Sequence, residues 1–176
     1  MGQLPLAFDK TTGCLPADPP FHDATVEEVR KALVEAFQAS ERRPRIFAAY
    51  VAHTEQWTPL LGEVVCEQWM NGSFVTSKLE PCDVDLLTLA SESVINGLDP
   101  DARAKVDELF LGPHTPKGGL CHAFLVPVAP PGTPGEQATR EQLDFWRRWF
   151  GRQRPRDGGH AKGIVRLRGE VNRGEC

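Results

Sequence analysis

The sequence lacks a hydrophobic run long enough to span a membrane, and its beginning, MGQLPLAFDKTTG, lacks the basic-then-apolar pattern of a secretory signal. Residue 6 is leucine, where N-myristoylation would need a hydroxyl-bearing side chain. These absences disfavour a membrane partner and a secreted protein. We therefore expect a cytoplasmic protein.

The sequence also lacks any CxxC pair. Its five cysteines are odd in number and widely spaced, at positions 14, 66, 82, 121 and 176. This pattern disfavours a zinc site and agrees with a reducing compartment. We expect most of them to be small core residues, with Cys176 a thiol in the C-terminal tail.

Charge is unevenly distributed along the 176 residues, although the net value is only −4. From Arg140 onward, basic residues outnumber acidic ones by roughly two to one, so the remainder is acidic. Two interpretations stay open. The basic segment is either a solvated helix followed by an arginine-bearing loop, or a positive rim that faces the phosphates of a nucleotide or an RNA.

Hydrophobic periodicity predicts four helices and four strands. The helices are expected at 24–40, 44–61, 99–110 and 141–151, and the strands at 63–70, 83–90, 120–129 and 163–171. The 63–70 and 83–90 strands are joined by about a dozen residues without a helical pattern, so we expect them to pair with each other. The economical fold is α/β (α+β): a mixed β-sheet with helices packed on one side. Residues 1–22 are expected to form an irregular N-terminal arm, and residues 23–176 a single domain.

The segment WMNGSFVTSKLEPCDVDLL carries the strongest functional signal. Asp83 and Asp85 are separated by one residue, so on a strand both carboxylates point to the same face and can share a divalent cation. The Gly72-Ser73 pair precedes Asp83 by nine intervening residues. Glycine permits a close backbone approach, and exposed N–H groups with the Ser73 hydroxyl can hold phosphate. The combination predicts metal-assisted phosphoryl or nucleotidyl transfer, although either element alone is common in ordinary loops and turns.

These residues resemble the nucleotidyltransferase superfamily of the DNA polymerase beta type, in which Gly-Gly or Gly-Ser is followed by a strand with Asp/Glu-x-Asp/Glu. The stretch from Gly72 to Asp85 also looks similar to a G-S-F-V-T-x-K-x-x-P-x-D-x-D core of a small uncharacterised bacterial family of minimal nucleotidyltransferase-like proteins. LPADPPFHDAT is a loose echo of that family's N-terminal segment, and Lys162 to Val165 meets its closing K-G-I-V strand.

The resemblance implies a nucleotidyltransferase-like fold that binds Mg²⁺ and a nucleoside triphosphate such as ATP. Asp83 and Asp85 would be catalytic and would hold the metal, whereas Gly72, Ser73 and Lys78 would bind the nucleotide. The superfamily normally adds a third carboxylate from a later strand, but the matching strand LCHAFLVPV has no acid. His122 is the candidate for this third position, either as a base or as a structural residue.

Further residues carry weaker signals. Lys78 and Lys117 lie in loops and are either phosphate ligands or simply solvated. Lys162 starts the last strand and is expected to face the site. An aromatic group on the 141–151 helix has helical spacing, which fits core packing and, less well, base stacking: Phe145, Trp146, Trp149 and Phe150.

The sequence leaves three candidate functions open. The first is a Mg²⁺-dependent nucleotidyltransferase that moves a nucleotide to an acceptor hydroxyl on an RNA end, a protein or a small molecule. The second is a catalytically degenerate fold that binds nucleotides or a protein partner, as in toxin–antitoxin pairs, on analogy alone. The third is an RNA-binding protein that uses the arginine-rich C-terminal region and shows strongly salt-dependent binding.

Overall fold

The computed structural model describes residues 6–62, 65–115 and 119–167 of the chain. At its centre lies a five-stranded sheet in the order β1-β5-β2-β3-β4. The strands are β1 (Phe21–Ala24), β2 (Val65–Asn71), β3 (Val84–Ser91), β4 (Cys121–Val128) and β5 (Ile164–Leu167). β1 and β5 are parallel, as are β3 and β4, whereas β2 is antiparallel to β3 and β5. The predicted mixed sheet and the pairing of the two strands that flank the Gly-Ser motif are confirmed.

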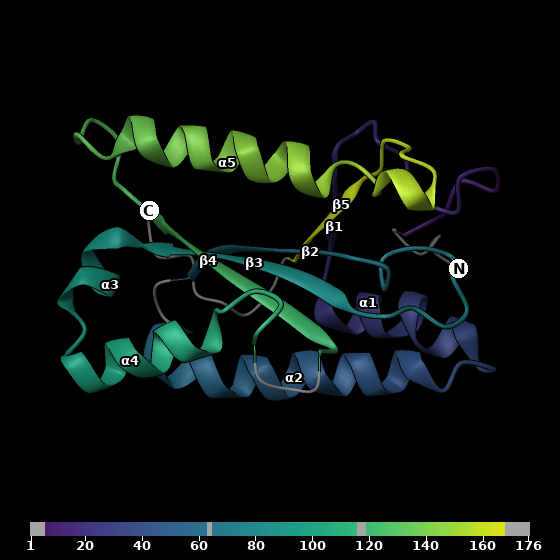
Figure 1. Ribbon diagram of the computed structural model, residues 1–176, viewed down its shortest axis with the longest axis horizontal. Helices are drawn as coiled ribbons and strands as arrows, with labels where there is room; N and C mark the ends of the chain where they lie inside the picture. The colour runs from purple at the N-terminus through teal and green to yellow at the C-terminus, as the bar shows by residue number, and fades with distance from the viewer. Residues whose placement is uncertain (1–5, 63–64, 116–118, 168–176) are drawn as a thin grey trace.

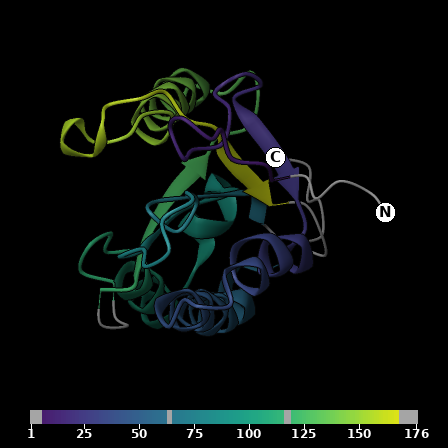
Figure 2. The ribbon, with the colours of Figure 1, turned by 90° about the vertical axis from the view of Figure 1, so that its right-hand side faces the viewer.

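Helices cover both faces of this sheet, so the expectation that they pack on one side is wrong (Figures 1 and 2). One face is covered by α5, and the other mainly by α1, α2 and α4. The helices are α1 (Val26–Leu33), α2 (Arg42–Leu61), α3 (Glu92–Gly97), α4 (Pro100–Leu109) and α5 (Glu136–Phe150). The reason lies in the central strands: Trp69 and Leu87 are buried with α5, while their neighbours Met70 and Leu86 are buried with α1 and α2. Strands that are apolar on both sides need a cover on both sides.

Two elements were not predicted from the sequence. β1 (Phe21–Ala24) is a four-residue edge strand that straddles the end of the expected arm and pairs with β5. α3 is a six-residue helix directly after β3. Both are too short to show a recognisable period, since a strand or a helical turn of this length offers only one or two apolar positions.

The first helix is shorter than predicted because a buried arginine interrupts it. α1 ends at Leu33 and is followed by a 3-10 turn, Glu35–Phe37. The carbonyl of Leu33 accepts a hydrogen bond from Nη1 of Arg43 at 2.9 Å, and the ring of Phe37 lies 3.7 Å from the guanidinium carbon. Contacts with a residue of the next helix thus replace the last helical turn.

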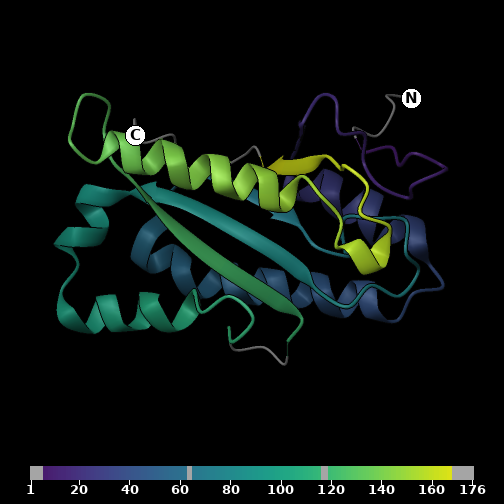
Figure 3. The ribbon, with the colours of Figure 1, turned by 45° about the horizontal axis from the view of Figure 1, so that its top comes forward.

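Crossover connections bring the functional segments to one edge of the sheet. β3 continues through α3 and α4 into its parallel neighbour β4, and α5 then crosses the opposite face before β5 (Figure 3). Because β3 and β4 are parallel, their first residues lie side by side: Val84 pairs with Cys121 and Asp85 with His122. Within the described ranges, no helix has the length and apolar character needed to cross a membrane.

Candidate metal and nucleotide site

Two buried carboxylates stand at the beginning of β3. Asp83 directly precedes the strand and Asp85 is its second residue, and both are buried. Both line one cavity of about 550 Å³ on the α5 side of the sheet. The prediction that the two acids share a face is therefore confirmed, and burial separates them from a merely solvated turn.

His122 on β4 completes a compact cluster with these acids. Its Nδ1 lies 3.1 Å from Oδ1 of Asp85 and 3.8 Å from Oδ2 of Asp83. One potential ligand atom from each of the three residues lies within 4.8 Å of the others. The hydrogen bond with Asp85 raises the pKa of His122, and burial opposes that shift. The structure thus brings the histidine together with both acids, as the third member of the cluster.

Gly72 is required because the backbone of β3 passes very close to it. Its φ is +84°, in the region that side-chain-bearing residues rarely adopt, and a Cβ atom there would lie 2.8 Å from the amide nitrogen of Asp85. The carbonyl of Asp83 accepts a hydrogen bond from the Phe74 amide at 3.0 Å. A close backbone approach was expected at this glycine, beside a bound phosphate. In the structure, the close approach is between Gly72 and the backbone of the strand that carries the two acids.

Ser73 links the two halves of the motif. Its hydroxyl accepts a hydrogen bond from the Cys82 amide at 2.7 Å and lies 3.0 Å from Oδ1 of Asp83, to which it can donate. The Ser73 amide also points to Oδ1 of Asp83, at 3.3 Å. These bonds fix the Asp83 carboxylate, so Ser73 has a positioning role in addition to any contact with phosphate.

A fully buried arginine, which the sequence analysis did not single out, anchors the loop after Ser73. Arg43 on α2 donates hydrogen bonds to the carbonyl groups of Phe74, Thr76 and Lys78. Burial lowers the pKa of Arg43 to about 10. In the sequence, Arg43 is one of two adjacent arginines at a helix start, and nothing in that pattern distinguishes a buried anchor from a solvated side chain.

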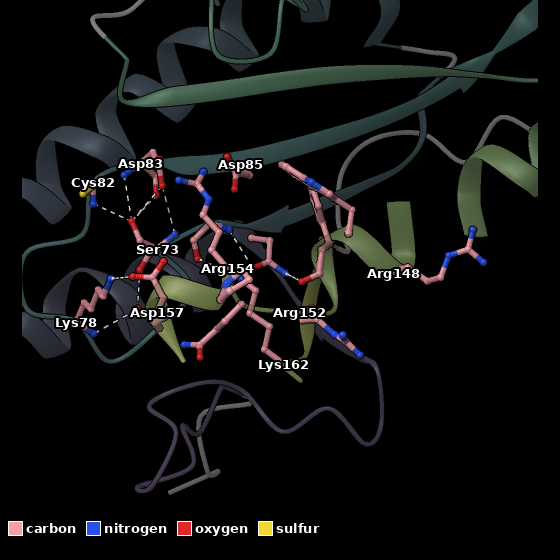
Figure 4. A pocket seen from close by; sticks show the side chains of 17 residues that line it. Ser73, Lys78, Cys82, Asp83, Asp85, Arg148, Arg152, Arg154, Asp157 and Lys162 are labelled. Atoms are coloured by element: carbon pink, nitrogen blue, oxygen red, sulfur yellow. Dashed lines mark hydrogen bonds and ion pairs between the residues drawn. The ribbon is translucent and has the colours of Figure 1, made fainter. Parts of the chain in front are cut away.

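The cavity beside the acids is walled by basic groups from segments far apart in sequence (Figure 4). Lys78 lines it and forms an ion pair with Asp157, with Nζ and Oδ1 3.1 Å apart. Lys162, just before β5, is buried and places Nζ 3.5 Å from the carbonyl of Gly72. Burial lowers the pKa of Lys162, and the nearby Asp85 acts in the opposite direction. The expectation that Lys162 faces the site is confirmed, whereas Lys117 lies outside the described residues.

Three arginines of the C-terminal segment complete this wall: Arg148, Arg152 and Arg154. The side chain of Arg154 points toward the acid pair (Figure 4). The basic excess after Arg140 was the only signal for these residues. The two interpretations of this basic excess were a solvated helix and a positive rim. The charges along α5 are solvated, whereas the C-terminal end of α5 and the following loop face the cavity, so each interpretation holds for a part of the segment.

The aromatic group on α5 divides into two pairs. Trp146 and Phe150 pack into the core between α5 and the sheet, as expected. Phe145 and Trp149 remain 51% and 43% exposed. Core packing therefore explains only half of the group.

The arrangement fits a divalent cation with bound phosphate. Magnesium in proteins commonly takes one or two carboxylates and completes its coordination with water and phosphate oxygens. Asp83 and Asp85 offer such oxygens, while Lys78, Lys162 and the arginine wall offer compensation for phosphate charge. Among the described residues, the cavity has one further acid, Asp157, which pairs with Lys78 and does not join the cluster. Glu92 begins α3, after the opposite end of β3.

Comparison with known proteins gives a family but no function. No curated protein and no solved structure matches the chain. Residues 6–168 match a protein family described as a family of unknown function, DUF6932. This match includes every residue of the site described above. The chain therefore belongs to the family DUF6932.

Proposed function

We propose that this protein is a Mg²⁺-dependent nucleotidyltransferase that moves a nucleotide from a nucleoside triphosphate to an acceptor hydroxyl. The observation that carries the proposal is the cluster of Asp83, Asp85 and His122, whose two acids line a cavity with a basic wall. Buried acids without a compensating cation are costly. A bound cation would neutralise the charge of the acids, and a polyanionic substrate would neutralise the charge of the basic side chains that line the cavity.

Asp83 and Asp85 would hold the metal, which when bound supplies Lewis acidity and neutralises phosphate charge. The chain's own groups have separate tasks. Ser73 holds the Asp83 carboxylate through its hydroxyl and amide. Lys162 and Lys78 place positive charge on two sides of the cavity, where a triphosphate would lie. His122 holds Asp85 in place through its Nδ1.

In the proposed reaction, the acceptor oxygen forms a bond to the α-phosphorus of the triphosphate. The bond from that phosphorus to the bridging oxygen of the β-phosphate breaks, pyrophosphate leaves, and the acceptor hydroxyl loses its proton to water. The protein contributes positioning and electrostatic stabilisation, which are the main sources of rate in phosphoryl transfer.

A second candidate function is nucleotide binding without transfer. It is favoured by one specific observation: the residue from the neighbouring strand that contacts the acids is His122, not a carboxylate. A protein of this kind would bind a nucleoside triphosphate through the same groups and act as a sensor or as a partner of another protein.

The proposal is tested by calorimetric titration of each of the four nucleoside triphosphates, with Mg²⁺ and with EDTA. We compare the protein with Asp85→Asn and with Asp101→Asn, a control that removes an exposed acid on α4 across the sheet. Even partners that only support metal ligands are worth about 10- to 100-fold in affinity, so Asp85→Asn should weaken Mg²⁺-dependent binding by at least about tenfold.

Binding that is indifferent to EDTA and to Asp85→Asn would refute the metal site. If binding depends on both, incubation with a radiolabelled triphosphate and candidate acceptors separates the two functions. Release of pyrophosphate supports transfer, and tight binding without release supports the nucleotide-binding alternative.

A further inference from the structure

A second cavity, of about 530 Å³, lies next to the first one, between α5 and the beginning of β4. We call it the aromatic shelf. It is lined chiefly by Phe124, Phe145, Trp146 and Trp149, with Arg154 and His122 at its edge. Exposed aromatic side chains rarely cluster on a protein surface unless they bind a ligand or partner, because their contact with water is unfavourable.

The exposed rings of the shelf are held in place by partly buried ones. The Trp149 ring packs against Trp146, with centroids 5.5 Å apart at 88°, and against Phe124, at 5.8 Å and 75°. Phe145 packs edge-on against Trp146 at 5.4 Å. Since Trp146 and Phe124 pack against the core, the two exposed rings are supported from beneath and need little ordering when a ligand binds.

The shelf adjoins the acid cluster. His122 borders the shelf and also contacts Asp85, while Trp149 and Arg154 line both cavities. A ligand on the shelf would therefore have one end beside His122, which contacts Asp85, and next to the cavity that Lys78 and Lys162 line. One cavity is lined by the two acids and its neighbour by the histidine that contacts them, and a reaction between a donor and an acceptor requires two adjacent sites of this kind.

The charge around the shelf favours an anionic ligand. In the described part of the chain, Arg148, Arg152 and Arg154 form no ion pair, and all three line the cavity that the shelf adjoins. Flat aromatic rings beside arginines form the pattern that single-stranded nucleic acids bind, with bases stacked on the rings and phosphates next to the basic groups. An unphosphorylated protein segment would use the rings but leave the arginines without partners.

We propose that the aromatic shelf binds the 3′-terminal nucleotide of a single-stranded nucleic acid, which serves as the acceptor. This inference rests on the proposed function. The terminal base stacks on Trp149 and Phe145, Arg154 contacts the backbone phosphate, and the terminal hydroxyl lies beside Asp83 and Asp85. The nucleoside triphosphate occupies the other cavity.

The test measures the fluorescence anisotropy of a short single-stranded RNA labelled at its 5′ end, without triphosphate. The variants are Trp149→Leu, which keeps an apolar side chain but loses the ring, and Trp149→Phe, which keeps a ring. Phe47→Leu, on α2 across the sheet, is the matched control. A stacked base contributes about 1–3 kcal/mol, so Trp149→Leu should weaken binding by about 5- to 100-fold, while Trp149→Phe and Phe47→Leu retain most of it.

Two further comparisons locate the contact. Arg154→Gln should weaken binding and reduce its dependence on salt concentration by about one phosphate contact. An RNA that ends in a 3′ phosphate should bind more weakly than one that ends in a hydroxyl, because its added charge would lie against the acids. Equal binding of the two RNAs would overturn the placement of the 3′ end.

The outcomes separate this inference from the proposed function. If triphosphate binds but no RNA does, or if Trp149→Leu binds RNA as well as the wild type does, the shelf is not the acceptor site and the proposed function still stands. If RNA binding requires Trp149 but no triphosphate binds, the shelf is confirmed as a nucleic-acid site and the proposed function fails. Urea unfolding of each variant shows whether it is folded, and Arg154→Gln and the 3′-phosphate RNA keep the test valid if Trp149→Leu is not.

Discussion

His122 and Asp85 lie directly opposite each other on the parallel strands β4 and β3, with Nδ1 and Oδ1 3.1 Å apart. The pairing places an imidazole at the position where the proposed chemistry would otherwise use a third carboxylate. A neutral or positive ring beside two acids reduces their mutual repulsion. The imidazole therefore stabilises the two neighbouring carboxylates when no metal is bound, but it offers a nitrogen where a third carboxylate would offer an oxygen ligand.

The first prediction concerns replacement of this ring. His122→Asp adds a third buried acid, so we expect the variant to be less stable without metal and to gain more stability from Mg²⁺ than the wild type does. His122→Asn, which is neutral and similar in size, is the matched control. Thermal unfolding over a series of Mg²⁺ concentrations measures both effects, and an identical response of the Asp and Asn variants would show that residue 122 is remote from the cation.

The second prediction concerns Arg43. Arg43→Met removes the donor to the buried carbonyl groups of Phe74 and Thr76 in the loop after Ser73 and of Leu33 at the end of α1, and unsatisfied buried acceptors cost about 1–3 kcal/mol each. We expect a loss of at least about 3 kcal/mol in the free energy of unfolding. Arg45→Met, exposed on the same helix, should change it by less than about 0.5 kcal/mol. Urea unfolding measures both, and comparable losses would contradict the anchoring role.

The third prediction separates backbone conformation from crowding at Gly72. Gly72→Ala suffers from both a positive φ and a contact of 2.8 Å with the backbone of Asp85, whereas Gly132 has a φ of +77° with nothing within 4 Å. A left-handed conformation alone costs an alanine about 1–2 kcal/mol. We expect Gly132→Ala to lose about that amount of unfolding free energy, and Gly72→Ala clearly more. Equal losses would mean that β3 can move away from residue 72.

The fourth prediction concerns alkaline pH. Burial raises the pKa of Tyr50 to about 12, whereas an exposed tyrosine in the unfolded chain ionises near its usual value of about 10. Above about pH 10 the unfolded state therefore loses the phenolic proton first, and stability falls by up to about 1.4 kcal/mol per pH unit until about pH 12. Below this window both states keep the proton and the effect vanishes.

Tyr50 is the only tyrosine, so its ionisation can be followed directly by ultraviolet absorbance. In the folded protein, tyrosinate absorbance should be absent at pH values where the urea-unfolded protein already shows it. Tyr50→Phe should make the decline of stability with pH less steep. Full ionisation of the folded protein near pH 10 would show that residue 50 is accessible to solvent.

The sequence was sufficient for the parts that depend on local pattern. Alternation at i and i+2 placed Asp83 and Asp85 on one face, and the helical period located α2 and α4 to within two residues. It also located the end of α5, which begins at Glu136, five residues before the predicted start. The helix predicted from residue 99 begins at Pro100, and the Asp99 side chain accepts a hydrogen bond from the Ala102 amide at its start. These features are set by neighbours within a few residues of each other in the chain.

The parts that failed depend on which segments meet in space. Arg43 and the Ser73 loop are separated by 31 residues or more, and their contact through backbone carbonyls carries no residue-type signature. The same holds for Asn71, whose side-chain amide donates to the carbonyl of Phe150 at 2.9 Å and ties β2 to the end of α5. The two-sided cover of the sheet also required knowledge of the strand order.

Because β5 lies between β1 and β2, the site is assembled late, after the C-terminal segment of the chain has been made. β5 pairs with β1 and β2, which both lie far earlier in the chain, so the central pairing is formed late, and such long-range pairing is slow to form. During synthesis from the N-terminus, the acids and the Gly-Ser turn emerge well before Arg152, Arg154 and Lys162. A ribosome-bound chain that ends before these residues would carry the two acids without most of the basic side chains that line their cavity, so the proposed phosphate site would be complete only after the segment before β5 has been made.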